Sequence, residues 1–244
     1  MLNHCSVVLL SLVMAFSHPF PLCAQQASKN PPSWTIQKLE GWTLHVSSRF
    51  KEAEQQDVAR AIELLQGQLK EVIAVVPKEA LKKLQSVPLY FSPTYPSVSP
   101  RAEYHPGAGW LRDNGRDPKM AKGIEFTNIS IFEEETRRMP NFALHELAHA
   151  FHDQVHGFDH KEIEALFERA KASGRYDRVQ RQDAEGRLSW DQAYAITNSA
   201  EYFAETSEAY FSRNDFFPFN RQELHNHDPQ MESLLEKLWN LESP

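Results

Sequence analysis

Two histidines and a glutamate stand close together at 145–149, where the chain reads HELAH. If this segment is helical, His145 and His149 lie four residues apart and face the same side of the helix. Both imidazoles can then bind one metal ion, and neutral histidine nitrogen is a common ligand of zinc. Glu146 is rotated by about 100° from His145 around a helix. The spacing therefore predicts one Zn²⁺ ion with Glu146 beside it as a proton acceptor.

A catalytic zinc site also needs a third protein ligand and an open position for water or substrate. One known continuation of the motif has histidine at position 155, where this chain has Val155. A glutamate from a later helix is the alternative, and the segment 198–210 offers Glu201, Glu205 and Glu208. We predict Glu201 as the ligand and Glu205 as a carboxylate that orients the ligands from behind.

Other roles remain open for these residues. Asn198 and Glu201 have the spacing of a capping box, so Glu201 could serve only to cap a helix. Glu205 and Glu208 compete with Glu201 as ligands, and the histidine–glutamate motif could be an ordinary surface pair. We expect Asn198 to lie close behind the ligands, and Asp153 either to orient a metal-bound histidine or to lie in solvent.

The HELAH motif and the later segment YAITNSAEYFAE (194–205) together resemble the catalytic domain of anthrax lethal factor and related secreted bacterial metallopeptidases. In that family a tyrosine stands seven residues before the liganding glutamate and an acidic residue four after it. Tyr194 and Glu205 occupy those positions around Glu201. The resemblance covers roughly residues 140–212. It implies a zincin fold of the gluzincin type, peptide hydrolysis, and a Tyr194 hydroxyl that stabilises the oxyanion.

The formal net charge is −7. Nucleic acid and anionic membranes select basic surfaces, so neither is expected as the main partner. Hydrophobic residues make up 41% of the chain, which is enough for a core. We therefore expect a folded protein whose partner is a peptide or protein substrate.

The N-terminus has the layout of a signal peptide. An apolar run at 7–16 is too short to span a bilayer but has the size of a signal-peptide core. We predict a signal peptide at 1–24, a flexible leader at 25–33, and a secreted or periplasmic protein without stable membrane insertion. Both cysteines, Cys5 and Cys23, lie in the predicted signal peptide, so the mature chain would have no disulfide. A lipid anchor at Cys23 is a weaker alternative.

Residue patterns predict strands and a helix first, and helices afterwards, within a single domain at 34–244. The expected elements are a hairpin at 34–47, a helix at 53–76, strands at 89–91 and 123–131, and helices near 141–156, 161–173, 198–212 and 229–241. This order predicts an α+β fold with a small N-terminal sheet and helix, an active-site helix, and a helical C-terminal lobe around a cleft.

Substrate contacts are expected from the chain before the active-site helix. The segment 92–118 is rich in Pro and Gly, and long loops of this kind often cover clefts. His105 and Trp110 in this loop are therefore candidates for substrate contact. The strand at 123–131, with a bulge or an edge position, could pair with an extended substrate and present Phe126 to it.

Taken together, the sequence predicts a secreted zinc metallopeptidase with Glu146 as general base. One alternative is a non-catalytic binding module on the same scaffold. Glu146 argues against it, because a structural zinc site does not need that carboxylate. Another is a zinc amidase that acts on a non-protein amide, such as one in the cell wall, because its ligands would be the same.

Overall fold

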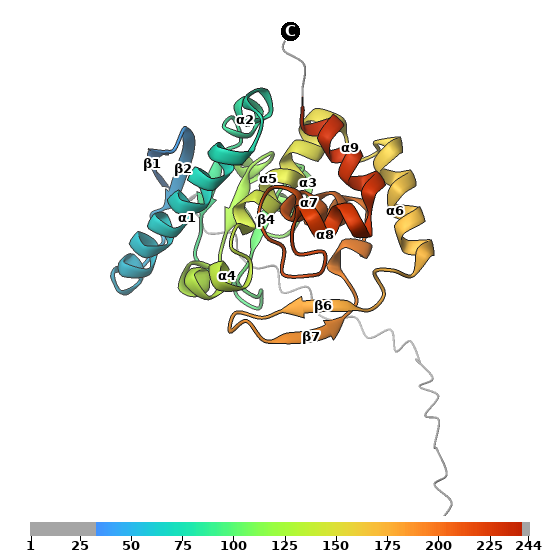
Figure 1. The fold of residues 1–244 in the computed structure, drawn as a ribbon. Coiled ribbons are helices and arrows are strands. Elements are labelled where there is room, and N and C mark those ends of the chain that lie inside the picture. Colours follow the sequence, from blue (N-terminus) through green and yellow to red (C-terminus); the bar gives the residue numbers. More distant parts are fainter. Residues whose placement is uncertain (1–32, 241–244) are drawn as a thin grey trace, which may run out of the picture.

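The computed structural model describes residues 33–240. The predicted signal peptide and all but one residue of the predicted leader lie outside this range. Helices and strands are both present, so the α+β fold class is confirmed (Figure 1). Within the described range, no helix is long and apolar enough to cross a membrane.

A five-stranded sheet occupies the N-terminal half, in the order β1-β2-β3-β5-β4. Its strands are β1 (Trp34–Leu39), β2 (Trp42–Ser47), β3 (Leu89–Phe91), β4 (Ala102–Tyr104) and β5 (Ile124–Phe126). The predicted hairpin is confirmed, and its two-residue turn has positive φ at both Glu40 and Gly41, as turns between twisted antiparallel strands require. β2, β3 and β5 run parallel, whereas β4 is antiparallel to β5 and occupies the edge.

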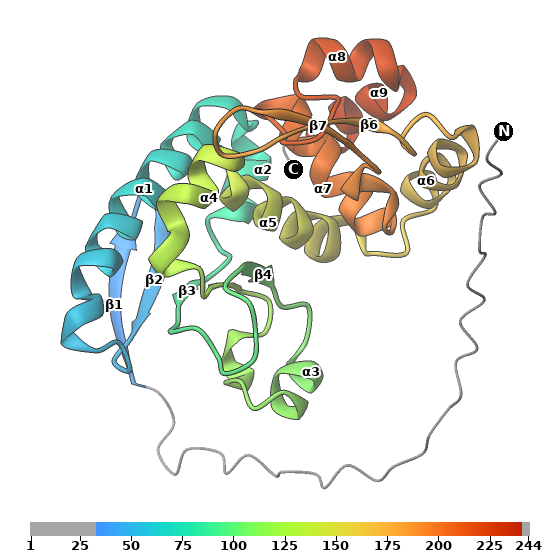
Figure 2. The ribbon, with the colours of Figure 1, turned by 90° about the horizontal axis from the view of Figure 1, so that it is seen from below.

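Helix α1 (Gln55–Val75) confirms the predicted amphipathic helix. Its apolar positions recur every three or four residues, and Val58, Leu65, Leu69 and Val72 are buried. Figure 2 shows α1 alongside β1 and β2. Pro77 separates α1 from the short helix α2 (Lys78–Leu84), which was not predicted.

The rest of the chain is mostly helical. Its elements are α3 (Ala108–Asp113), α4 (Phe132–Arg138), α5 (Phe142–Phe151), α6 (Lys161–Ser173), the hairpin strands β6 (Val179–Gln182) and β7 (Leu188–Asp191), α7 (Ser199–Phe211), α8 (Arg221–His227) and α9 (Pro229–Trp239). A π-helical turn (His152–His156) extends α5. Asp228 caps α9 and Pro229 opens it.

One large apolar core runs from the sheet to the last helix. Helix α5 lies at its centre, where it contacts α1 and β4 on the N-terminal side and α7 on the C-terminal side (Figure 2). At its far end, Phe151 stacks on Trp239 of α9 with ring centroids 4.0 Å apart. The predicted active-site helix is therefore the element that joins the two halves.

The strand predicted at 123–131 was too long and wrongly placed at an edge. It ends at Phe126, and the chain then turns into a 3₁₀ segment (Ile129–Ile131) followed by α4, so the expected bulge is absent. β5 lies between β3 and β4, so the free edge belongs to β4. The hairpin of β6 and β7, together with α3, α4 and α8, was also missed.

Helix α1 fixes the start of α5 through a buried glutamine. Gln68 Oε1 accepts a hydrogen bond from the backbone N–H of Ala143 at 2.9 Å, and the Gln68 carbonyl accepts from Asn141 Nδ2 at 3.0 Å. Asn141 Oδ1 accepts in turn from the N–H of Leu144 at 3.0 Å. Free N–H groups in the first turn of a buried helix need such partners. These bonds therefore set the position from which α5 enters the core.

Replacing Gln68 with leucine should lower the free energy of unfolding by about 2 kcal/mol, because the buried N–H of Ala143 then lacks an acceptor. Gln56→Ala, an exposed change on the same helix, should alter it by less than about 0.5 kcal/mol. Urea unfolding of both variants measures the difference. Equal stabilities of the two variants would show that Gln68 does not anchor α5.

Candidate metal centre

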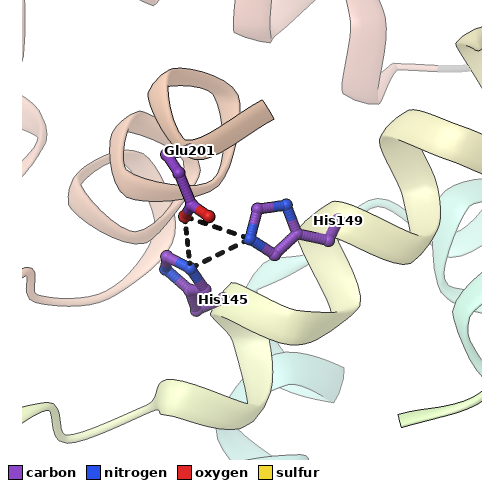
Figure 3. A group of neighbouring side chains, drawn as sticks. All are labelled: His145, His149 and Glu201. Carbon is purple, nitrogen blue, oxygen red and sulfur yellow. Dashed lines mark hydrogen bonds and ion pairs between the residues drawn. The ribbon is translucent and has the colours of Figure 1, made fainter. Parts of the chain in front are cut away.

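The structure brings together the two motif histidines and the glutamate predicted as third ligand. His145 Nε2 lies 3.1 Å from His149 Nε2, and Glu201 Oε2 lies 3.2 Å from each of them (Figure 3). Two ligand atoms on one tetrahedral zinc ion, each at about 2.0–2.1 Å, stand about 3.3 Å apart. The three donor atoms therefore have the separation and the chemistry that fit one shared Zn²⁺ ion.

Capping fixes Glu201 at the start of α7. Asn198 Oδ1 accepts hydrogen bonds from the N–H groups of Ala200 and Glu201, both at 2.9 Å. The Glu201 carboxylate does not complete the capping box but points to the histidines of α5 (Figure 3). Burial raises the pKa of Glu201, but hydrogen bonds to the two histidines outweigh it, so the net shift is well downward.

A buried carboxylate holds the other nitrogen of His145. Glu208 Oε2 lies 2.9 Å from His145 Nδ1, whereas Glu205 Oε1 lies at 3.6 Å and Glu205 Oε2 accepts from Asn214 Nδ2 at 3.0 Å. The predicted position of Glu205 behind the ligands is close to what is found, but the direct partner is Glu208. Burial raises the pKa of Glu205 to about 8 and that of Glu208 to about 7.

The surroundings favour protonation of His145 in the metal-free protein. Burial alone lowers its pKa, but hydrogen bonds to Glu201 and Glu208 raise it, and the net shift is well upward. A metal ion must therefore displace a proton from this ring before it can bind.

Glu146 and Tyr194 both line the cleft that opens onto the donor atoms. Glu146 is buried, and its Oε2 accepts a hydrogen bond of 2.7 Å from the backbone N–H of Tyr104 on β4. Tyr194 lies in a 3₁₀ turn before α7 and is 48% exposed. Partial burial, and then the negative charge of Glu201, raise the pKa of its hydroxyl.

The cleft has a volume of about 770 Å³ and lies between β4 on one side and the β6–β7 hairpin with α7 on the other. Ion pairs connect α4, the β6–β7 hairpin and the chain after α7, all of which line the cleft. Asp215 accepts from Arg138 of α4 at 2.7 Å and from Arg181 of β6 at 3.4 Å. These arginines are therefore neutralised by carboxylates of the cleft itself.

Four predicted positions need correction. Phe126 is fully buried in the core, and His105, 3% exposed, contacts Glu125 beneath β4, so neither lines the cleft. Trp110 is half exposed but stacks on His105, away from the cleft. Asp153 orients no ligand, because it binds the Tyr104 hydroxyl. His105 and Trp110 are held among the buried polar residues next to β4. Asp153 is held in the π-helical turn after α5.

A second group of potential ligands, Glu103, His105 and Glu125, lies beneath β4. Arg116 already donates to Glu103 at 2.5 Å and to Glu125 at 2.9 Å. Its guanidinium also lies over the rings of Tyr95 and Trp110. A buried cation thus stands between the two carboxylates, and this group braces the sheet edge.

The family model described as "Anthrax toxin lethal factor, N- and C-terminal domain" matches residues 120–238. The matched segment runs from just before β5 into α9, so it includes both helices that carry the donor atoms. It covers just under half of the chain. Over this segment the chain is similar to lethal factor, as the motif residues indicated. No curated protein and no solved structure matches the chain.

Glu208→Gln should weaken zinc binding roughly 10- to 100-fold, because a neutral amide is a poorer acceptor for the ring N–H of His145 than a carboxylate. Glu205→Gln is the matched control and should have a smaller effect, since this carboxyl lies farther from the ring. Competition with a chelator of known affinity measures both variants. A larger loss in Glu205→Gln would assign the orienting role to Glu205 instead.

Zinc binding near neutral pH should release protons, because the raised pKa of His145 favours a protonated ring before the metal enters. The apparent affinity should therefore rise with pH and fall in acid. Calorimetric titrations in buffers of different ionisation enthalpy count the protons. A binding enthalpy that is independent of buffer would contradict this description of His145.

Proposed function

We propose that this protein is a zinc-dependent peptidase. The observation that carries the proposal is the triangle of His145, His149 and Glu201 at the floor of an open cleft, with Glu146 beside it. A zinc ion held there would act as a Lewis acid. It would polarise the scissile carbonyl and lower the pKa of water, so that a nucleophile is available at neutral pH. The similarity to lethal factor over 120–238 supports the same function.

Glu146 is suited to move protons. One carboxylate oxygen is held by the N–H of Tyr104, which leaves the other free to face the cleft. It would accept the proton of the attacking water and pass it to the leaving amine. Because the backbone bond fixes its position, the carboxylate needs little reorganisation between the two transfers.

Tyr194 is suited to bind the oxyanion. It stands in the turn that precedes the capped start of α7, on the same wall of the cleft as Glu201. Its raised pKa keeps the hydroxyl protonated, so the hydroxyl can donate a hydrogen bond to negative charge that develops on the substrate.

The substrate would pair with β4 rather than with β5. Arg101 and His105 use their backbone groups toward the β5 side, with bonds to Thr127 at 2.8 Å and Gly123 at 2.9 Å. Alternation along a strand then directs the backbone groups of Ala102 and the carbonyl of Tyr104 to the free edge, while the N–H of Tyr104 is held by Glu146. An extended peptide added there would lie along the cleft.

Export of the mature chain through the predicted signal peptide at 1–24 belongs to the same proposal. A peptide substrate outside the cytoplasm would suit a chain whose only cysteines lie in that segment.

Glu146→Gln should lower the rate of peptide cleavage by about 10²–10⁴-fold while zinc content is kept, because the proton acceptor is lost and the ligands are not. Tyr194→Phe should lower kcat by about 10- to 100-fold, with zinc again retained. A peptide library read by mass spectrometry measures cleavage in the wild type and both variants.

The same experiment separates the alternatives. No cleavage of any peptide by the zinc-loaded wild type would contradict the peptidase proposal. Hydrolysis of peptidoglycan fragments by that protein, lost in Glu146→Gln, would then favour an amidase.

A further inference from the structure

The edge strand β4 is tied to the chain that follows the active-site helix. The hydroxyl of Tyr104 donates to Asp153 Oδ2 at 2.6 Å and accepts from Gln154 Nε2 at 3.1 Å. Both partners belong to the π-helical turn after α5. Such turns are rare and concentrate at functional sites. We name Tyr104, Asp153 and Gln154 the edge latch.

Two contacts of Tyr104 point in different directions. Its side chain enters the edge latch, while its backbone N–H points outward from β4 and donates to Glu146 at 2.7 Å. One residue therefore links the proposed base, the strand on which the substrate would lie and the end of the helix that carries the histidines.

We propose that the edge latch positions β4 for catalysis. The inference rests on the proposed function, because it concerns how the base and the substrate edge are held relative to the donor atoms. Tyr104 is buried, and its hydroxyl bond to Asp153 ties β4 to the turn that ends α5. If the latch opens, the N–H of Tyr104 moves away from Glu146, and a shift of about 1 Å in such a group can slow a reaction strongly.

A hydrogen bond that only stabilises the fold would have no effect on the reaction rate. Tyr176 offers a matched comparison, because its buried hydroxyl also donates to an aspartate, Asp228, at 3.2 Å, in the C-terminal half. Loss of the Tyr176 hydroxyl removes one buried hydrogen bond, and loss of the Tyr104 hydroxyl removes two part-buried ones, so both variants should lose stability. Only loss of the Tyr104 hydroxyl should alter the reaction.

The test compares Tyr104→Phe, Asp153→Ala, Asp153→Asn and Tyr176→Phe in the zinc-loaded chain, assayed well below their unfolding temperatures. Tyr104→Phe and Asp153→Ala should lower kcat by about tenfold and kcat/KM by at least as much, with zinc content unchanged. Asp153→Asn should recover most of the rate, because its amide oxygen still accepts from the hydroxyl. Tyr176→Phe should keep the wild-type rate.

Amide hydrogen exchange at residue 104 gives a readout that does not need activity. Exchange should be faster in Tyr104→Phe than in Tyr176→Phe. An active wild type with full rates and unchanged exchange in Tyr104→Phe would overturn the latch and leave the proposed function standing. An inactive wild type would overturn the proposed function and, with it, the catalytic role of the latch.

Discussion

Helix α5 carries polar side chains into the middle of an apolar core, and this constraint organises the structure around it. A polar group buried without a partner costs about 1–3 kcal/mol, and a charged one costs more. His145 and Glu146 are both buried. Each neighbour of α5 therefore supplies a bond: α1 holds its first turn, β4 holds Glu146, and α7 holds both nitrogens of His145.

These partners also explain how the donor atoms are brought together. Glu208 orients the ring of His145, and the cap at Asn198 sets where Glu201 begins α7. The side chains are held by elements rather than by loops, which favours a precise site. Asp215 connects α4 to the β6–β7 hairpin through its arginine partners, and all three residues line the cleft.

Long, periodic or motif-bearing segments could be predicted from the sequence. The stripe of α1, the Asp228–Pro229 start of α9 and the spacing of HELAH each reflect a local rule that the fold obeys. The α+β class followed from the order of these elements.

Features that depend on tertiary contacts could not be predicted. β4 and β5 have three residues each, too few for alternation to show which is the edge. Whether Glu208 or Glu205 contacts Nδ1 of His145 depends on how α7 is rotated against α5. Phe126 and His105 point into the protein because of sheet register, which no local pattern reveals.

The proposed zinc ion would sit among the donor atoms of His145, His149 and Glu201. Crystals of the zinc-loaded chain, with diffraction measured at the zinc absorption edge, test this placement most directly. We expect one strong anomalous peak about 2.0–2.1 Å from both Nε2 atoms and a Glu201 carboxylate oxygen. No peak there, or a peak at Glu103, His105 and Glu125 instead, would contradict it.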